Sequence, residues 1–169
     1  MKKKLVVCLL LTICFSSIFF RISVSARNEY EYIEQTENEE VIRITEEMSK
    51  IYPICPELIQ AQIFYESSNN RTIVSEYGDI GYMQVNPRWQ SERMEKLGVY
   101  DLNDGYSNIL VGMDLLFELF QKYGELELVL MAYNEGEERA LVKYNSGEIS
   151  RYAKDIIELS EELERLHGK

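Results

Sequence analysis

Apolar residues recur at helical spacing over most of the chain, and no segment shows the alternation of a convincing strand. The first such pattern runs from Val41 to Ile51, and Tyr52 and Pro53 end it. The second begins at Pro56, which suits a first helical position, and is too apolar for a surface helix. The pattern predicts a mainly α domain with little or no β structure. Four more helices are expected after a long irregular stretch, at residues 107–123, 126–133, 137–144 and 149–166.

The irregular stretch after the second predicted helix has two parts. Asn69 to Gly81 is a loop whose two glycines suit tight turns, and Trp89 to Asp104 shows no regular pattern. Long ordered loops in small domains tend to be functional. We expect the first part to fold back over the end of the second helix, where Glu66 lies.

The chain divides into three parts by composition. Residues 1–26 combine lysines at the start, an apolar stretch over residues 5–20 and the small-residue ending Val24-Ser25-Ala26 of a signal peptide. This stretch is shorter than the roughly 20 residues that span a bilayer, so cleavage is favoured over a membrane anchor. Residues 27–40 contain six acids and few apolar residues, which is typical of a flexible linker. One domain, residues 41–169, remains, and it can bury a core without disulfides.

Charge and rare residue types exclude several functions. All 29 acidic residues follow Ala26, but only 14 of the 18 basic residues do, which leaves a net charge of −15. Such a surface is a poor partner for nucleic acid. The single histidine, His167, receives no role, which removes Ser-His-Asp and His-Glu-x-x-His chemistry. Cys55, the only cysteine after Ala26, cannot close an internal disulfide, and we expect it to be a buried small residue.

Glu66 is the candidate catalytic residue. It lies where the apolar helix gives way to a polar Ser-Ser-Asn-Asn run, and therefore on the last turn of a largely buried helix. Burial disfavours its charged form, and so does the negative end of the helix dipole. Both effects raise the pKa, as a general acid requires. Taken alone, a solvated glutamate at a helix end is the simpler interpretation.

Further motifs follow Glu66 in a fixed order. Ser75 comes nine residues later, then Gly81 to Gln84 with the sequence GYMQ, and much later Ala132 to Gly136 with the sequence AYNEG. In this combination the chain resembles lytic transglycosylase domains of the soluble-lytic-transglycosylase type. These carry Glu-Ser at a helix end, a serine nine residues on, Gly-Leu-Met-Gln and Ala-Tyr-Asn-Ala-Gly. The resemblance covers about residues 41–157 and implies a single lysozyme-like helical domain.

The resemblance also implies an enzyme, a lyase that cuts the bond between N-acetylmuramic acid and N-acetylglucosamine in peptidoglycan without water. Glu66 would protonate the glycosidic oxygen and then accept the proton of the muramic acid C6 hydroxyl, which closes a 1,6-anhydro ring. Because this nucleophile is internal, a second catalytic residue is not needed. No metal and no cofactor are implied. By the match of motifs, Ser75 and Gln84 would hold the sugar, Ser75 through the N-acetyl group, and Met83 would shape the floor of the site. Tyr133 would form a hydrogen bond near Glu66, and Asn134 would brace the loop. Tyr152 would lie near the active site.

Scaffold roles remain open for several of these residues. Tyr133, Asn134 and Tyr152 are as well explained by packing or capping as by substrate binding. Tyr82, where the family has leucine, is either a core residue or an aromatic wall for a sugar ring.

Two other functions also remain open. Asp79, between the two glycines of the loop, would make the chain a hydrolytic muramidase if it activated a water molecule. The favoured role for Asp79 is a turn residue that accepts backbone N–H groups. A catalytically inactive wall-binding module is the third function, and the intact Glu66 argues against it.

The export signal and the resemblance together predict a location and partners. We expect a secreted or extracytoplasmic protein at the bacterial cell wall, tethered to the membrane through residues 5–20 if the signal is not cleaved. Peptidoglycan glycan strands are the expected partner, and envelope secretion or conjugation machinery is a further candidate.

Overall fold

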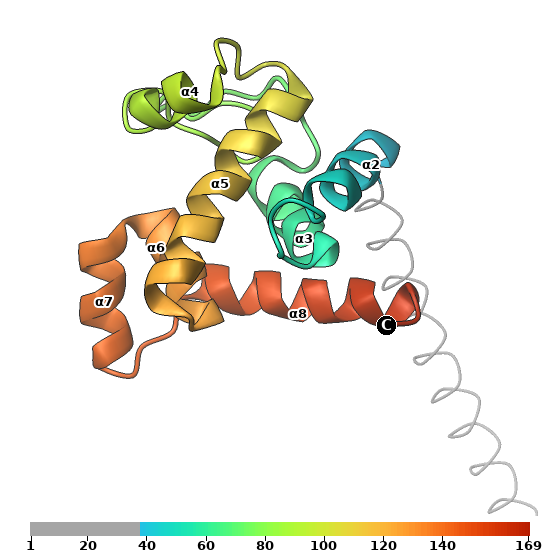
Figure 1. The fold of residues 1–169 in the computed structure, drawn as a ribbon. Coiled ribbons are helices and arrows are strands. Elements are labelled where there is room, and N and C mark those ends of the chain that lie inside the picture. The colour runs from blue at the N-terminus through green and yellow to red at the C-terminus, as the bar shows by residue number, and fades with distance from the viewer. Residues whose placement is uncertain (1–37) are drawn as a thin grey trace, which may run out of the picture. The chain divides into compact units, whose positions relative to one another are not determined.

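The structure is a computed structural model that describes residues 38–169 (Figure 1). The predicted signal peptide and most of the acidic linker lie outside the described residues. The mainly helical fold predicted from the hydrophobic pattern is confirmed. None of the helices in the described part is both long and apolar enough to cross a membrane. The helices of residues 38–169 are α2 (Glu39–Met48), α3 (Pro56–Ser67), α4 (Ser91–Leu97), α5 (Gly105–Tyr123), α6 (Leu126–Glu135), α7 (Glu137–Asn145) and α8 (Arg151–Leu166).

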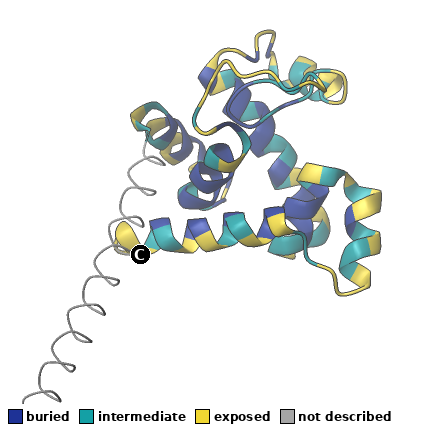
Figure 2. Cartoon of the chain, turned by 180° about the vertical axis from the view of Figure 1, so that it is seen from behind, coloured by how far each residue is buried: buried dark blue, intermediate teal, exposed yellow. Residues whose placement is uncertain are grey.

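The core forms around α3. This helix packs against α2 and α8, while α5 packs against α2, α4 and α6. Figure 2 shows the buried residues gathered where these helices meet. Because α3 has neighbours on several sides, its buried residues lie nearly all round the helix rather than along one stripe. Burial of an Ile, Leu or Met side chain in this core contributes about 1.5–3 kcal/mol to the stability of the fold. The largest fully buried side chains are Ile44, Met48, Ile59, Ile63, Met83, Ile109, Met113, Leu116, Leu130, Met131, Ile156 and Leu163.

The start of α2 differs from the predicted start. Asn38 caps this helix, because its side chain accepts the amide N–H of Val41 at 3.1 Å. Glu39 and Glu40, which we assigned to the linker, therefore form the first helical turn, where acidic side chains complement the helix dipole.

Two further differences concern α4 and α5. Asp104 caps α5 by accepting the amide N–H of Ser107 at 2.9 Å, so this helix begins at Gly105, before the start that we predicted at residue 107. The sequence did not predict α4 within the segment from Trp89 to Asp104. None of its seven residues is buried, so the sequence of this helix lacks the hydrophobic periodicity that would have predicted it.

The loop between α3 and α4 is held against the core by Asn108 of α5, which is fully buried. The Asn108 side chain donates to the carbonyl oxygens of Ile80 at 2.8 Å and Leu102 at 3.0 Å, and accepts the amide N–H of Met83 at 2.9 Å. Gly81 passes so close that an added Cβ would lie 2.5 Å from the Asn108 amide nitrogen. Asn108 therefore fixes the loop that carries several of the predicted site residues.

The same loop holds the β structure of the described residues, which consists of isolated bridges from Ile80 to Val74 and to Val85. Tyr82 in this loop is only 2% exposed, and its hydroxyl donates to Glu40 Oε2 at 2.6 Å. Burial, followed by this hydrogen bond, raises the pKa of Tyr82 to about 12. Tyr82 is thus a core residue, and the alternative that it forms an aromatic wall is wrong.

Candidate active site

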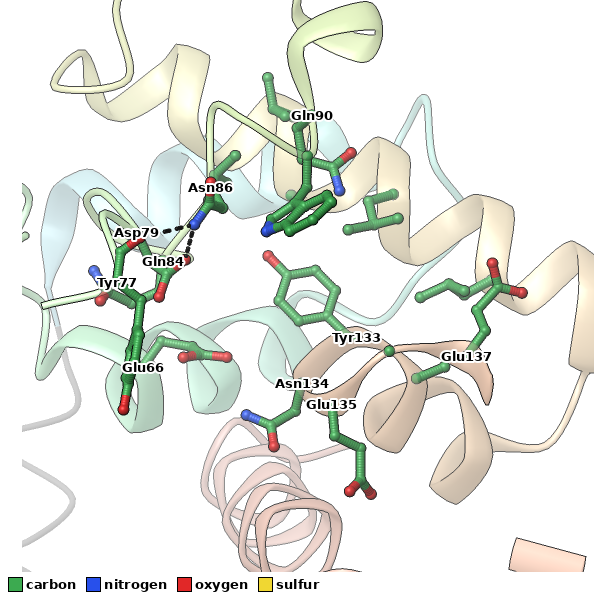
Figure 3. A pocket seen from close by; sticks show the side chains of 18 of the residues that line it. Glu66, Tyr77, Asp79, Gln84, Asn86, Gln90, Tyr133, Asn134, Glu135 and Glu137 are labelled. Atoms are coloured by element: carbon green, nitrogen blue, oxygen red, sulfur yellow. Dashed lines mark hydrogen bonds between the residues drawn. The ribbon is translucent and has the colours of Figure 1, made fainter. Parts of the chain in front are cut away.

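Glu66 lies on the last turn of α3, as predicted, and Ser68 ends the helix in a left-handed conformation with φ of 49°. Its side chain lines a cleft of about 810 Å³ (Figure 3). One side of the cleft is the loop that includes Tyr77 and Gln90, and the other side is formed by α5, α6 and the start of α7. The chain thus places a carboxyl group where a ligand in the cleft can reach it.

The surroundings of Glu66 keep it close to half protonated at neutral pH. Burial is the largest cause and raises the pKa, a hydrogen bond from Tyr152 lowers it, and the charge of Asp79 raises it again, to about 7. The Tyr152 hydroxyl donates to Glu66 Oε1 at 2.5 Å and itself accepts Gln62 Nε2 at 3.1 Å. Burial is an expected cause of the raised pKa, and the charge of Asp79 is a further cause that the sequence did not predict. Such a group can give up a proton and take one back at the same pH.

A hydrogen bond links Tyr133 to Met83 at the floor of the cleft. The Tyr133 hydroxyl donates to the main-chain carbonyl of Met83 at 2.8 Å, and the Tyr133 side chain lines the cleft. Burial first, and the charge of Glu66 second, raise the pKa of Tyr133 well above its usual value. The Met83 side chain is fully buried and fills the space beside Gly112, which itself lines the cleft. Met83 therefore supports the floor from beneath, outside the cleft surface.

Ser75, Asp79 and Asn86 form a polar cluster on the loop side of the cleft. The Ser75 hydroxyl donates to Asp79 Oδ2 at 2.8 Å, and Asn86 Nδ2 donates to Asp79 Oδ1 at 2.8 Å. Ser75 Oγ also accepts the amide N–H groups of Tyr77 and Asp79. Ser75 does not line the cleft, whereas Asp79 and Asn86 do. The Asp79 carboxylate is therefore fixed by side-chain donors, where we expected backbone N–H groups, and it shares one cleft with Glu66.

Gln84 lies on a backbone turn that few residue types adopt, with φ of 46°. Its Nε2 donates to the carbonyl of Gly81 at 3.0 Å, and its side chain lines the cleft. Asn134, an exposed residue of α6, also lines it. The sequence-predicted residues that the fold brings to the cleft surface are Glu66, Asp79, Gln84, Tyr133 and Asn134; those behind it are Ser75, Met83 and Tyr152.

Sequence reasoning missed several residues that line the cleft. The Asn86-Pro87-Arg88-Trp89-Gln90 segment follows the GYMQ motif with only Val85 between them, and that closeness in sequence was the available signal. Glu135 lies within the AYNEG motif itself, whereas the residues of α7 carried no such signal. The missed lining residues include Tyr77, Asn86, Trp89, Gln90, Glu135, Glu137 and Arg139. Within residues 38–169 there is no group of three or more His, Cys, Asp or Glu side chains that could hold a metal ion.

Solved lytic transglycosylases share this fold. The 70 kDa soluble lytic transglycosylase of Escherichia coli matches with a TM-score of 0.66 and 20% sequence identity, over 75% of this chain and 24% of that one. The lytic transglycosylase Slt of Pseudomonas aeruginosa, in an inactive mutant, matches with a TM-score of 0.65 and 17% identity, again over 75% and 24%. A complex of the 70 kDa enzyme with bulgecin A matches equally well, with a TM-score of 0.66. At these identities the likeness concerns the fold alone, and it confirms the fold expected from the sequence.

Sequence comparison defines the family. The transglycosylase SLT domain matches residues 43–155, and the chain belongs to this family. A transglycosylase of the Enterobacteria phage PRD1 is 34% identical over 89 residues, which are 53% of this chain and 32% of the phage protein. The chain thus spans a minor part of the length of each of these relatives.

Proposed function

We propose that this chain is a peptidoglycan lytic transglycosylase. It cuts the bond between N-acetylmuramic acid and N-acetylglucosamine without water and leaves 1,6-anhydromuramic acid ends. The observation that carries the proposal is Glu66, a carboxyl group with a pKa of about 7 that lines an open cleft of an SLT-family domain. The family's own activity on cell-wall glycan supports the choice of substrate.

The reaction needs one group that works first as an acid and then as a base. Protonated Glu66 gives its proton to the glycosidic oxygen, the bond from C1 to that oxygen breaks, and the N-acetylglucosamine part leaves as an alcohol. The Glu66 carboxylate then takes the proton of the muramic acid C6 hydroxyl while O6 bonds to C1. Atoms and charge balance, and Glu66 returns to its protonated form. Because the attacking hydroxyl belongs to the substrate, proximity replaces a second catalytic group.

The neighbours of Glu66 support both halves of this cycle. The hydrogen bond from Tyr152 stabilises the carboxylate that remains after the first proton transfer. The charge of Asp79 and burial favour return of the proton in the second. Gln84 and Asn134 line the cleft and offer amide groups to sugar hydroxyl or N-acetyl groups.

A hydrolytic muramidase is the second candidate, because Asp79 shares the cleft with Glu66. Both Asp79 oxygens already accept a side-chain hydrogen bond, from Ser75 and Asn86, which favours a fixed charge over a water-activating base. Mass analysis of the products from purified wall separates the two candidates. Anhydro products are one water lighter than the corresponding hydrolysis products, which carry reducing ends.

We further propose that the protein acts outside the cytoplasmic membrane, at the bacterial cell wall. The support is the export signal at residues 1–26, which lies outside the described residues. The mature chain is expected to begin at or near Arg27, and N-terminal sequencing of the exported protein tests this. Finding residues 1–26 intact on membrane-associated protein would mean a membrane anchor instead. Envelope secretion or conjugation machinery remains a proposed partner.

A further inference from the structure

Two exposed aromatic side chains face the cleft. Tyr77 is 75% exposed and Trp89 is 82% exposed, and both line the cleft that contains Glu66. Exposure alone carries no argument, because single apolar side chains on a surface are ordinary. Tyr100, for example, is 89% exposed and does not line the cleft. What distinguishes Tyr77 and Trp89 is that a ligand in the cleft would cover them.

One asparagine holds the backbone beneath both aromatic residues. Asn86 Nδ2 donates to the carbonyl of Tyr77 at 3.2 Å, and the Asn86 carbonyl accepts the amide N–H of Trp89 at 3.1 Å. Asn86 Oδ1 also accepts the amide N–H of Arg88 at 3.0 Å, which closes the turn that carries Trp89. The backbone positions of the two rings are therefore set before a ligand arrives, which reduces the ordering cost of binding.

The chemistry of the cleft wall fits a sugar ring. Aromatic rings carry a negative face, which attracts the weakly positive C–H groups on one face of a pyranose. Polar groups on the same surface, those of Gln84, Gln90 and Asn134, can meet the hydroxyl and N-acetyl groups at the ring edge. In Figure 3, Tyr77 and Glu66 lie on the same side of Tyr133, with Glu137 on the other.

We propose that Tyr77 and Trp89 are stacking platforms that hold glycan rings in the cleft. The inference rests on the proposed function for the identity of the ligand as a glycan. It goes beyond it by assigning substrate binding to two residues outside the predicted motifs. Asn86 is then a positioning residue that acts through both rings.

The experiment uses the fact that Trp89 is the only tryptophan of the chain, so its fluorescence reports on this one site. The full chain with Glu66→Gln is titrated with a purified tetrasaccharide of alternating N-acetylglucosamine and N-acetylmuramic acid, which it cannot cut. We expect a saturable blue shift of the emission as a sugar ring covers the indole. Saturable binding seen by calorimetry without any change in emission, or no binding at all, would overturn the proposal.

Matched variants separate stacking from folding. Trp89→Ala and Tyr77→Ala should each weaken binding about threefold to tenfold, by the usual size of an aromatic contact. Trp89→Phe should restore most of the affinity, and Tyr100→Ala should leave it unchanged. In the active enzyme the same losses should appear mainly in KM. Equal affinities for Trp89→Ala and Tyr100→Ala would refute the platform.

The two proposals can fail separately. If wild type and Glu66→Gln do not cut wall but the emission still shifts with the tetrasaccharide, the platform stands and the transglycosylase does not. If wild type cuts wall and Trp89→Ala has the wild-type KM, the transglycosylase proposal stands and the stacking platform does not.

Discussion

The two ends of α3 each carry a glutamate, and the fold gives these two side chains opposite properties. Glu57 lies in the first turn and Glu66 in the last. Burial raises the pKa of both. Yet the pKa of Glu57 falls to about 2, whereas that of Glu66 rises to about 7. Burial therefore prevails at Glu66, whereas at Glu57 the hydrogen-bonding partners outweigh it.

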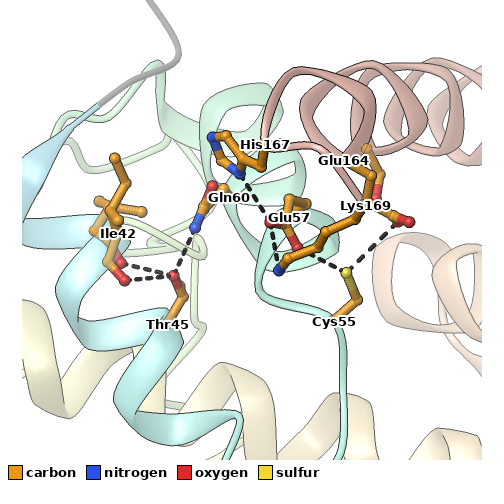
Figure 4. A network of polar contacts seen from close by, with 10 residues as sticks. Ile42, Thr45, Cys55, Glu57, Gln60, Glu164, His167 and Lys169 are labelled. Carbon is orange, nitrogen blue, oxygen red and sulfur yellow. Dashed lines mark hydrogen bonds and ion pairs between the residues drawn. The ribbon is translucent and has the colours of Figure 1, made fainter.

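Glu57 is surrounded by donors (Figure 4). Cys55 Sγ donates to its Oε2 at 2.9 Å, and His167 Nδ1 and Lys169 Nζ contact its Oε1 at 2.8 and 2.7 Å. The hydrogen bonds from Cys55, Lys169 and His167 together outweigh burial, which by itself would raise the pKa. This end of α3 is built to hold a charge, and it ties the C-terminal residues to the start of the helix. His167, to which the sequence assigned no role, thus has a structural one.

Among the described residues, Glu66 has one hydrogen-bond donor and one repelling charge. Tyr152 supplies the hydrogen bond, and Asp79 supplies a negative charge that opposes ionisation. The Glu66 end of α3 therefore keeps a proton available near neutral pH. Ionised Glu66 lowers the stability of the fold, whereas ionised Glu57 does not.

The largest test removes the acid itself. Glu66→Gln keeps the size and the hydrogen-bonding capacity of the side chain but cannot donate a proton to the glycosidic oxygen. We expect the release of soluble fragments from purified wall to fall by at least about 10²–10⁴-fold, the usual contribution of a general acid. Circular dichroism and thermal unfolding of the variant serve as the folding control. A variant that keeps most of the wild-type rate would refute the assignment of Glu66.

The second test compares how Glu57 and Glu66 contribute to the free energy of unfolding as the pH changes. The folded pKa of Glu57 is lowered, so its stabilisation is present above the unfolded value of 4.5 and is lost as pH falls toward about 2. The folded pKa of Glu66 is raised, so its contribution is present below 4.5 and is lost as pH rises through about 7.

Substitutions at the two ends should therefore have opposite effects on the free energy of unfolding. At pH 8, Glu57→Gln should destabilise the fold by about 1–3 kcal/mol, since it weakens charged hydrogen bonds to a buried group. Glu66→Gln at the same pH should leave stability unchanged or increase it. Urea titrations at pH 5 and pH 8 measure both. Equal losses for the two variants at pH 8 would show that the ends do not differ.

The difference between the ends shows what a single sequence can reveal. The position of Glu66 followed from a local signal, an apolar helix that ends in a polar run, and the prediction of the last turn is confirmed. The partners of Glu57 gave no such signal, because His167 lies 110 positions away and only the packing of α8 on α3 brings it near. Local pattern thus predicted the acid and the helices other than α4, while contacts between distant segments decided the pKa values of the two glutamates.

The cleft shows the same division. The GYMQ and AYNEG motifs gave Gln84, Tyr133 and Asn134, all of which line it. The hydrogen bonds from Ser75 and Asn86 to Asp79 depend on how a loop with little regular structure folds back on itself. Sequence periodicity carries no information on such a loop, and so the hydrogen bonds of Asp79 were predicted incorrectly.

The third test removes the repelling charge beside Glu66. Asp79→Asn lowers the pKa of Glu66, because it deletes the charge that opposes ionisation. The alkaline limb of the pH–rate profile, which in the wild type falls through about pH 7, should move to lower pH. A large part of the wild-type rate should remain at acid pH. If the variant is as inactive as Glu66→Gln at every pH, and the wild-type products carry reducing muramic acid, Asp79 is a base and the enzyme is a muramidase.

The last test removes the hydroxyl group that donates to Glu66. Tyr152→Phe deletes the hydroxyl that donates to Glu66 Oε1, which among the described residues is the interaction that lowers the pKa of Glu66. The alkaline limb should therefore move to higher pH, opposite to the shift in Asp79→Asn. The rate at low pH should fall about tenfold, because the carboxylate formed after the first proton transfer loses a hydrogen bond worth about 1.5 kcal/mol, the lower end of the range for a charged acceptor. Profiles of wild type, Tyr152→Phe and Asp79→Asn on the same wall preparation measure both directions. If both variants move the limb in the same direction, local charge and hydrogen bonding do not set the acidity of Glu66, and the contrast with Glu57 has another cause.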